Sequence, residues 1–274
     1  MYTLNCKGKL LIINKPLVMG IINVTPDSFY DGGQHAALDH LIALAEKMVT
    51  DGADILDIGG QSTRPNSERI AADEELKRIL PAIKAIHHHF PQVIISTDTY
   101  YSKVAKEAVS AGASIVNDIS AGEIDKDMIS AVAALKVPYI CMHMKGTPAT
   151  MQKDPVYGDV VKEVLDFFIY KTNECKEAGI TDLIIDPGFG FGKTFRHNFQ
   201  LLKELNTFSM LQKPILAGLS RKATIYKTLG ITAAEALNGT TVLNTMALMN
   251  GASILRVHDV KEAKQAIQLF IEYR

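Results

Sequence analysis

Short apolar runs alternate along the chain with longer stretches whose apolar residues recur every three or four positions. The short runs are rich in Val, Ile and Leu and predict eight buried strands, over 18–22, 55–58, 93–97, 114–117, 138–142, 183–186, 214–218 and 253–257. The longer stretches predict helices near 38–50, 73–88, 102–111, 127–135, 156–178, 199–208, 222–229, 233–250 and 260–272. A short β-hairpin is expected over 4–15, ahead of the first run.

This alternation predicts parallel βαβ units, because parallel neighbours need a crossover connection. Strands that are apolar throughout are typical of a sheet covered on both faces. Eight units in 274 residues favour an α/β fold, a closed (β/α)8 TIM barrel forming one domain over 1–274 with an N-terminal hairpin. A doubly wound open sheet is the alternative, but it would place one phosphate loop after the first strand. Here polar residues follow several strands, which favours the barrel, whose chemistry lies at the carboxyl ends of its strands.

Composition narrows the class of protein further. With 47% hydrophobic and 22% charged residues, an ordinary soluble globular protein is expected. A net charge of −1 with scattered basic residues argues against a nucleic-acid partner, and no run approaches the roughly 18 apolar residues of a membrane helix. Residues 1–9 lack the order of a signal peptide. The three cysteines, Cys6, Cys141 and Cys175, have no paired spacing, so free thiols and a cytoplasmic location are expected.

The stretch from 183 to 194 has the clearest chemistry. An apolar strand ends at Asp186, and a buried carboxylate is costly unless hydrogen-bond donors meet it. Pro187 then opens a loop with glycine at every second position, where a ligand can approach the backbone closely. Lys193 and Thr194 follow and are expected to offer a cation and a hydroxyl group to that ligand.

Polar residues at other strand ends complete the pattern. In a barrel, Asp98, Asn117, Asp186 and Lys222 would meet inside the mouth, where acids and an amide suit a heterocycle with several N–H donors. Arg256 and His258 lie two positions apart on the last strand and therefore share a face. Paired cationic groups there indicate a phosphate or diphosphate site. Asn23 offers a neutral oxygen that suits Mg²⁺ bound together with a diphosphate.

Structural interpretations compete with some of these assignments. Asp118 and Asp259 each follow a strand and are as well explained as helix N-caps. The run from His87 to His89 resembles a metal site, but consecutive side chains on a helix point in different directions, so a solvated helix end is expected. Cys141 lies in an apolar run and is expected to be a core residue rather than a nucleophile.

With these residues laid out, the chain resembles the dihydropteroate synthase family over 18–263. The resemblance rests on eight blocks in the same order, at 23–29, 62–65, 97–99, 116–118, 142–144, 186–194, 220–222 and 256–260. Gln61 stands where the family often has Glu, Ala223 where Ser is common and Ala236 where an arginine is often found. The resemblance implies a transferase that joins a dihydropterin-methyl diphosphate to p-aminobenzoate, releasing diphosphate and making dihydropteroate for folate synthesis. It also implies a homodimer formed through the last helices.

The resemblance also implies a role for each matching residue. The pterin site would comprise Asp98, Asn117, Asp186, Lys222, Met142 and Gly218. The diphosphate site would comprise Asn23, Arg256 and His258, with Asn23 also reaching Mg²⁺. The p-aminobenzoate site would comprise Thr63, Arg64, Pro65, Phe191, Ser220 and Lys222. Catalysis would involve Asp98, Lys222, Arg64 and Asp31, the last two on loops that fold over the site.

Two other functions would use part of the same residue set. A methyltransferase that moves a methyl group from methyltetrahydrofolate to a corrinoid protein would share the pterin residues, but it needs neither the 62–65 loop nor the Arg256 and His258 pair. A pterin-binding module without catalysis would have no use for a diphosphate site. The full set of residues therefore favours the synthase.

Overall fold

The computed structural model describes residues 1–24, 33–61, 69–148, 150–151 and 155–274, with the backbone alone for 33–36. In this part of the chain, a hairpin of β1 (Tyr2–Cys6) and β2 (Lys9–Ile13) precedes a repeating strand–helix pattern. The parallel strands are β3 (Leu17–Asn23), β4 (Ile55–Gly59), β5 (Ile94–Asp98), β6 (Ile115–Asp118), β7 (Tyr139–Met142), β8 (Leu183–Asp186), β9 (Leu216–Ala217) and β10 (Ile254–Val257).

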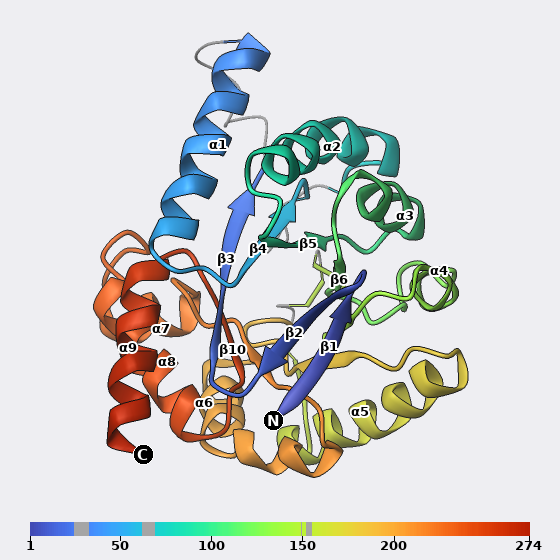
Figure 1. Ribbon diagram of the computed structural model, residues 1–274. Coiled ribbons are helices and arrows are strands. Elements are labelled where there is room, and N and C mark those ends of the chain that lie inside the picture. Colours follow the sequence, from blue (N-terminus) through green and yellow to red (C-terminus); the bar gives the residue numbers. More distant parts are fainter. Residues whose placement is uncertain (25–32, 62–68, 149, 152–154) are drawn as a thin grey trace.

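The eight parallel strands form one sheet in the order β8-β7-β6-β5-β4-β3-β10-β9. The two edge strands then meet, because Ile185 of β8 forms a parallel bridge with Ile215, directly before β9. The amide of Ile185 also donates to the carbonyl of Pro214 at 3.0 Å. The sheet therefore closes on itself with helices around it, which confirms the predicted (β/α)8 barrel (Figure 1).

Nine α-helices and one 3₁₀-helix follow the strands in the described ranges. They are α1 (Gly33–Thr50), α2 (Ala72–His89), α3 (Ser102–Ala111), α4 (Met128–Leu135), α5 (Val160–Glu177), α6 (Phe195–Lys203), η2 (Leu205–Leu211), α7 (Ala223–Leu229), α8 (Leu237–Met249) and α9 (Val260–Tyr273). The last helix is tied to the first strand–helix unit, since Lys264 Nζ of α9 lies 2.6 Å from the carboxylate of Asp54. None of these helices is long and apolar enough to cross a bilayer.

Four predicted helix starts differ from the structure by four or five residues, those expected at 38, 156, 199 and 233. Hydrogen bonds explain the last two. The helix expected over 199–208 is α6 followed by η2. It begins earlier because the Thr194 hydroxyl caps it by accepting from the amide of His197 at 3.2 Å. The helix expected from 233 begins at Leu237. The carbonyls of Ala233 and Ala234 instead accept from Arg221 Nη1, at 3.1 and 2.7 Å.

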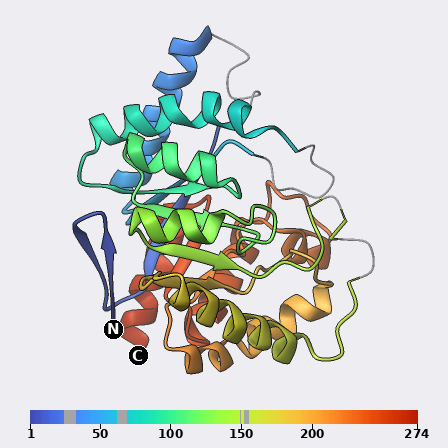
Figure 2. The same cartoon turned by 90° about the vertical axis from the view of Figure 1, so that its right-hand side faces the viewer.

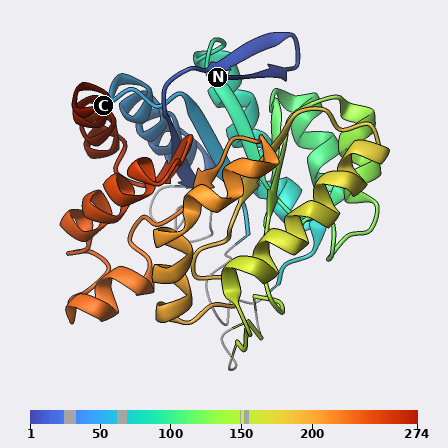
Figure 3. The same ribbon diagram turned by 90° about the horizontal axis from the view of Figure 1, so that it is seen from below.

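Alternation along the strands sorts side chains between two cores. One alternate set packs inside the barrel against the hairpin, and it comprises Met19, Ile55, Ile94, Ile115, Ile140, Ile184, Leu216 and Ile254. The hairpin contributes Leu4, Cys6, Leu11 and Ile13 to this cluster. Figures 2 and 3 both place the hairpin and the two chain ends at the same end of the molecule. The next inward positions along the strands are largely polar, so a charged layer lies directly above this apolar floor.

Candidate active site

An arginine held between two carboxylates lies in this charged layer. Arg256 of β10 donates from Nε to Asp57 Oδ2 at 2.7 Å and from Nη2 to Asp98 Oδ2 at 2.6 Å. The same Asp57 oxygen accepts from the side-chain amide of Asn117 at 3.0 Å. Four strands, β4, β5, β6 and β10, thus contribute one hydrogen-bonded cluster. Two acids around one guanidinium leave carboxylate oxygens available for further donors.

A second charged pair completes the layer. Asp186 ends β8, and its Oδ1 accepts from the amide of Gly188 at 2.7 Å. A Cβ placed on Gly218 would lie 3.8 Å from Lys222 Nζ and 3.9 Å from Asp186 Oδ2. Gly218 therefore leaves both charged groups uncovered. Lys222 Nζ donates to the carbonyl of Phe189, and Met142 pairs with Asp186 in the register of β7 and β8.

Burial raises the pKa values of Asp98 and Asp186 and lowers that of Lys222. It raises the pKa of Asp98 to about 7, with Arg256 opposing the shift and the nearby acid Asp57 adding to it. Burial also raises the pKa of Asp186, while the Lys222 ammonium opposes that shift. The pKa of Lys222 falls to about 8 for the same reason, with Asp186 acting against the shift. Groups with such perturbed pKa values are typical of functional sites.

The remaining predicted groups lie nearer the rim. His258, two residues beyond Arg256, is exposed, and its Nδ1 lies 3.0 Å from Ser220 Oγ. The backbone amide of His258 also donates to Ser220 Oγ at 3.2 Å. Asn23 is exposed at the end of β3. The Phe191 ring centroid lies 4.7 Å from Lys222 Nζ. The structure thus brings the described candidates to one end of the barrel. The candidates Asp31, Thr63, Arg64 and Pro65 lie outside the described residues.

Several assignments made from the sequence need correction. Lys193 is not offered to a ligand, because its side chain is buried and points into the protein's own backbone. The Thr194 hydroxyl caps α6. Asp118 is not a helix N-cap, since its carboxylate accepts from Ser120, Gly122 and the hydroxyl of Tyr139. Asp259 precedes α9 but forms an ion pair with Arg221 at 2.8 Å rather than capping the helix.

The structure confirms the other structural interpretations. The run from His87 to His89 is the exposed end of α2, and Cys141 is buried in the core.

Asp57 is the site residue that the sequence reasoning missed. It is fully buried, and its Oδ1 has no hydrogen-bond partner in the described part of the chain. The signal was present, because Asp57 stands between Leu56 and Ile58 in an otherwise apolar strand. A carboxylate at such a position is costly unless it is paired, and its partner Arg256 is distant in sequence.

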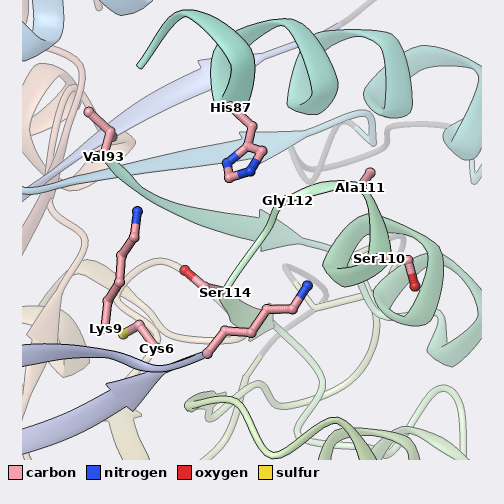
Figure 4. Close-up of a pocket in the computed structure, with 9 residues that line it drawn as sticks. Cys6, Lys9, His87, Val93, Ser110, Ala111, Gly112 and Ser114 are labelled. Atoms are coloured by element: carbon pink, nitrogen blue, oxygen red, sulfur yellow. The ribbon is translucent and has the colours of Figure 1, made fainter. Parts of the chain in front are cut away.

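A cavity of about 250 Å³ lies at the opposite end of the barrel, between the hairpin and the ends of α2 and α3. Cys6, Lys9, His87 and Ser114 are among the residues that line it (Figure 4). Its lysines serve the backbone, since Lys7 Nζ donates to the carbonyl of Val109 at 2.7 Å and Lys9 Nζ to that of Pro91. The cavity lies where the hairpin meets the barrel, and it is separate from the charged layer.

Comparison with known proteins agrees with this geometry. The model of a pterin binding enzyme family matches residues 19–258. The dihydropteroate synthase of Escherichia coli is 43% identical over 265 residues, which are 96% of this chain and 93% of that protein. The chain belongs to the dihydropteroate synthase family. It is accordingly a transferase, and these relatives decide against the corrinoid methyltransferase alternative.

Two solved structures of dihydropteroate synthase from Xanthomonas albilineans share the fold. The structure with 4-aminobenzoic acid superposes with a TM-score of 0.92 at 40% identity, covering 99% of this chain and 97% of that one. The complex with 7,8-dihydropteroate has a TM-score of 0.89 at 38% identity, covering 99% and 98%. The barrel described here is therefore the dihydropteroate synthase barrel.

Proposed function

We propose that this chain joins a dihydropterin-methyl diphosphate to p-aminobenzoate, releasing diphosphate and forming dihydropteroate. The observation that carries the proposal is the buried cluster of Asp57, Asp98, Asn117 and Arg256 on four strands. In this cluster the acids and the amide would accept hydrogen bonds from the N–H groups of a pterin. Asp186 and Lys222 would contact the other edge of the same pterin ring. Structures of the Xanthomonas albilineans relative hold 4-aminobenzoic acid in one case and 7,8-dihydropteroate in another, which supports p-aminobenzoate as a substrate and dihydropteroate as the product.

The cationic groups explain the diphosphate half of the substrate. Arg256 lies on β10, and His258 lies two positions later, directly after the strand. Asn23 is the last residue of β3. In our proposal they hold the diphosphate and neutralise its charge as it leaves. Diphosphate departs first, the electron-rich pterin stabilises the positive charge on the methylene group, and Asp98 strengthens that stabilisation. The weakly basic arylamine then attacks, held between Phe191, Ser220, Lys222 and the loop of Thr63, Arg64 and Pro65.

Mg²⁺ is the proposed cofactor. No group of three or more His, Cys, Asp or Glu in the described ranges could hold a metal by itself. This fits a metal that is bound through one or two protein oxygens together with substrate phosphates, which is the usual arrangement for Mg²⁺. Asn23 would supply the protein oxygen, and the ion would offset the negative charge of the diphosphate.

We also propose that the chain forms a homodimer in the cytoplasm. Val242, Met246 and Met249 are exposed on one face of α8, at spacings of four and three residues. An exposed apolar stripe of this kind is typical of an interface between subunits. The cytoplasmic location rests on Cys6, Cys141 and Cys175, which are all free and buried, as expected in a reducing compartment.

The decisive experiment separates the two chemical steps. Asp98→Asn is expected to slow diphosphate release by about 100-fold in the absence of p-aminobenzoate, because the developing cation loses its nearest negative charge. Release is measured in single turnovers of the dihydropterin-methyl diphosphate with enzyme in excess.

Asp57→Asn is the matched control, since it disturbs Arg256 but leaves the Asp98 carboxylate. It should slow release less than Asp98→Asn does. Release from the Asp98→Asn variant at the wild-type rate would contradict the stepwise mechanism, and a wild-type chain that releases no diphosphate with both substrates present would contradict the proposed reaction.

A further inference from the structure

A lysine is sealed inside the glycine-containing loop that follows β8. Lys193 is only 2% exposed. Its Nζ lies 3.0 Å from the carbonyl oxygens of Gly188 and Phe191, 3.2 Å from that of His143, and 2.9 Å from His143 Nδ1. Four acceptors, three of them carbonyl oxygens, thus form a cage around a nitrogen that carries three hydrogens as an ammonium group, so one hydrogen is shared. Burial lowers the pKa of Lys193 well below its usual range, and the surrounding acceptors favour the protonated form.

The imidazole in this cage acts as an acceptor. Burial, with the Lys193 charge second, lowers the pKa of His143 to about 2, so the ring is neutral. Its Nδ1 can then accept from the ammonium while Nε2 carries the ring proton. The His143 ring also packs edge-on against Phe167, with centroids 4.9 Å apart, so it cannot readily turn away.

The loop and the end of β7 approach so closely that Lys193 becomes their shared donor. A Cβ on Gly188 would lie 2.0 Å from the His143 carbonyl oxygen, and one on Gly192 would lie 2.2 Å from that of Lys145. Both glycines have positive φ angles, 69° and 63°. Glycine thus permits the approach, and the lysine supplies donors to carbonyls that the approach buries. A buried carbonyl without a donor would cost about 1–3 kcal/mol.

The same loop contacts Lys222 on its other side. Lys222 Nζ donates to the Phe189 carbonyl, and the Phe191 ring centroid lies 4.7 Å from the same nitrogen. A Cβ on Gly190 would lie 3.4 Å from Lys222 Cδ. One continuous set of contacts therefore runs from His143 through Lys193 and the loop to Lys222 and Phe191.

We propose that Lys193 is a positioning residue for the p-aminobenzoate half of the site. Its ammonium fixes the 188–192 loop against the end of β7 and thereby sets where Lys222 and Phe191 stand. Lys193 itself touches no substrate. The acids and amide of the buried cluster, Asp57, Asp98 and Asn117, belong to β4, β5 and β6, outside this set of contacts. Lys222 serves both halves of the site, so the loss is expected to fall mainly, not solely, on p-aminobenzoate. This inference rests on the proposed function, because it takes the two substrates from there.

The test replaces the ammonium with an apolar chain of similar length. Lys193→Met is expected to raise the KM for p-aminobenzoate and to lower kcat/KM for it by tenfold or more. Diphosphate release without p-aminobenzoate should stay within threefold of the wild-type rate. This split identifies positioning, because a general loss of folded protein would lower both reactions equally. Thermal unfolding of the same samples establishes the folded fraction.

Lys145→Met is the matched control. Lys145 lies beside the same loop, but it is exposed and its Nζ bonds the carboxylate of Glu163 at 3.1 Å. Both reactions should be unchanged in this variant. If Lys193→Met does not fold, His143→Leu removes the imidazole acceptor and keeps the carbonyl cage. It should show the same split at about threefold to fivefold.

Equal losses in the two reactions, or an unchanged KM in folded Lys193→Met or His143→Leu protein, would overturn the inference. Absence of diphosphate release from the wild-type chain with both substrates present would instead contradict the proposed function, so the two failures are distinguishable.

Discussion

Glu75 is a carboxyl group with no hydrogen-bond partner in the described part of the chain. It lies on the first turn of α2, fully buried, and neither oxygen is bonded. Burial raises its pKa from 4.5 to about 8, with Asp98 adding to the shift while Thr99 and Arg78 oppose it. The folded state therefore holds the proton more tightly than the unfolded state. The resulting stability is complete below about pH 4.5 and is lost as the pH rises through about 8.

Replacing this carboxyl group should stabilise the protein in alkali. At pH 9, Glu75→Gln is expected to raise the free energy of unfolding by on the order of 2–4 kcal/mol, because the wild-type protein must bury a charge there. At pH 5 the variant and the wild type should be nearly equal. Urea unfolding at the two pH values measures the difference.

The neighbouring Glu74→Gln is the control for this prediction. The Glu74 side chain is 46% exposed and pairs with Arg78 at 3.2 Å along the helix, so its effect should be small at both pH values. A Glu75→Gln variant with the same gain at pH 5 and pH 9 would show that the carboxyl group is not the cause.

Most site residues could be predicted because strand ends in a barrel converge, whatever their distance in sequence. Asp98, Asn117, Asp186, Lys222 and Arg256 were identified in this way, and the structure gathers them. The hydrogen-bond partners of these residues were not predictable, because they depend on which strands become neighbours and on how far each side chain extends.

Asp57 and Lys193 are two residues whose roles the sequence did not predict correctly: a site residue in the first case and a structural residue in the second. Asp57 was overlooked because its arginine is 199 positions away. Lys193 was assigned to a ligand, although the carbonyls that surround it are brought together only by the positive φ angles of the loop.

At the scale of elements, the hairpin closes the amino-terminal end of the barrel. Its two strands alternate, so that Leu11 and Ile13 pack inside against β3 and its neighbours, while Leu10 and Ile12 face outward. The hairpin was predicted from the sequence, but this alternation was not, because residues 10–13 are all apolar. The attachment of the hairpin to the barrel was not predictable either, since the sequence does not say what covers its buried face.

Removing part of this apolar floor should affect stability and leave chemistry intact. Ile13→Ala is expected to lower the free energy of unfolding by about 2–4 kcal/mol, because it leaves a cavity in a packed cluster. The KM values should not change, since the charged layer lies above. Chemical denaturation and steady-state kinetics measure the two effects.

Ile12→Ala provides the comparison from the next residue, which is 51% exposed where Ile13 is 4% exposed. It should cost less than about 0.5 kcal/mol. Similar losses in the two variants would contradict the packing of the hairpin against the barrel floor.

At the scale of the whole molecule, the exposed stripe of Val242, Met246 and Met249 should decide the oligomeric state. Two charges there, in Val242→Glu with Met246→Glu, are expected to convert a dimer into a monomer, because a desolvated carboxylate opposes association. Sedimentation velocity at micromolar concentration measures the mass of each species.

Ile169→Glu on α5 is the control, since it also changes an exposed apolar residue but on another face. It should remain dimeric. A double variant that sediments with the wild-type mass would exclude this stripe as the interface.

The covered floor of the barrel has a consequence for the order of events. With the hairpin packed over one end, ligands reach the charged layer from the carboxyl ends of the strands. In the proposed reaction, the pterin that bonds the deepest acids is expected to enter before the arylamine, which would rest nearer the rim. The new product can depart only after the space above it is clear. Sequential entry and exit through a shared portal thus follows from the architecture alone.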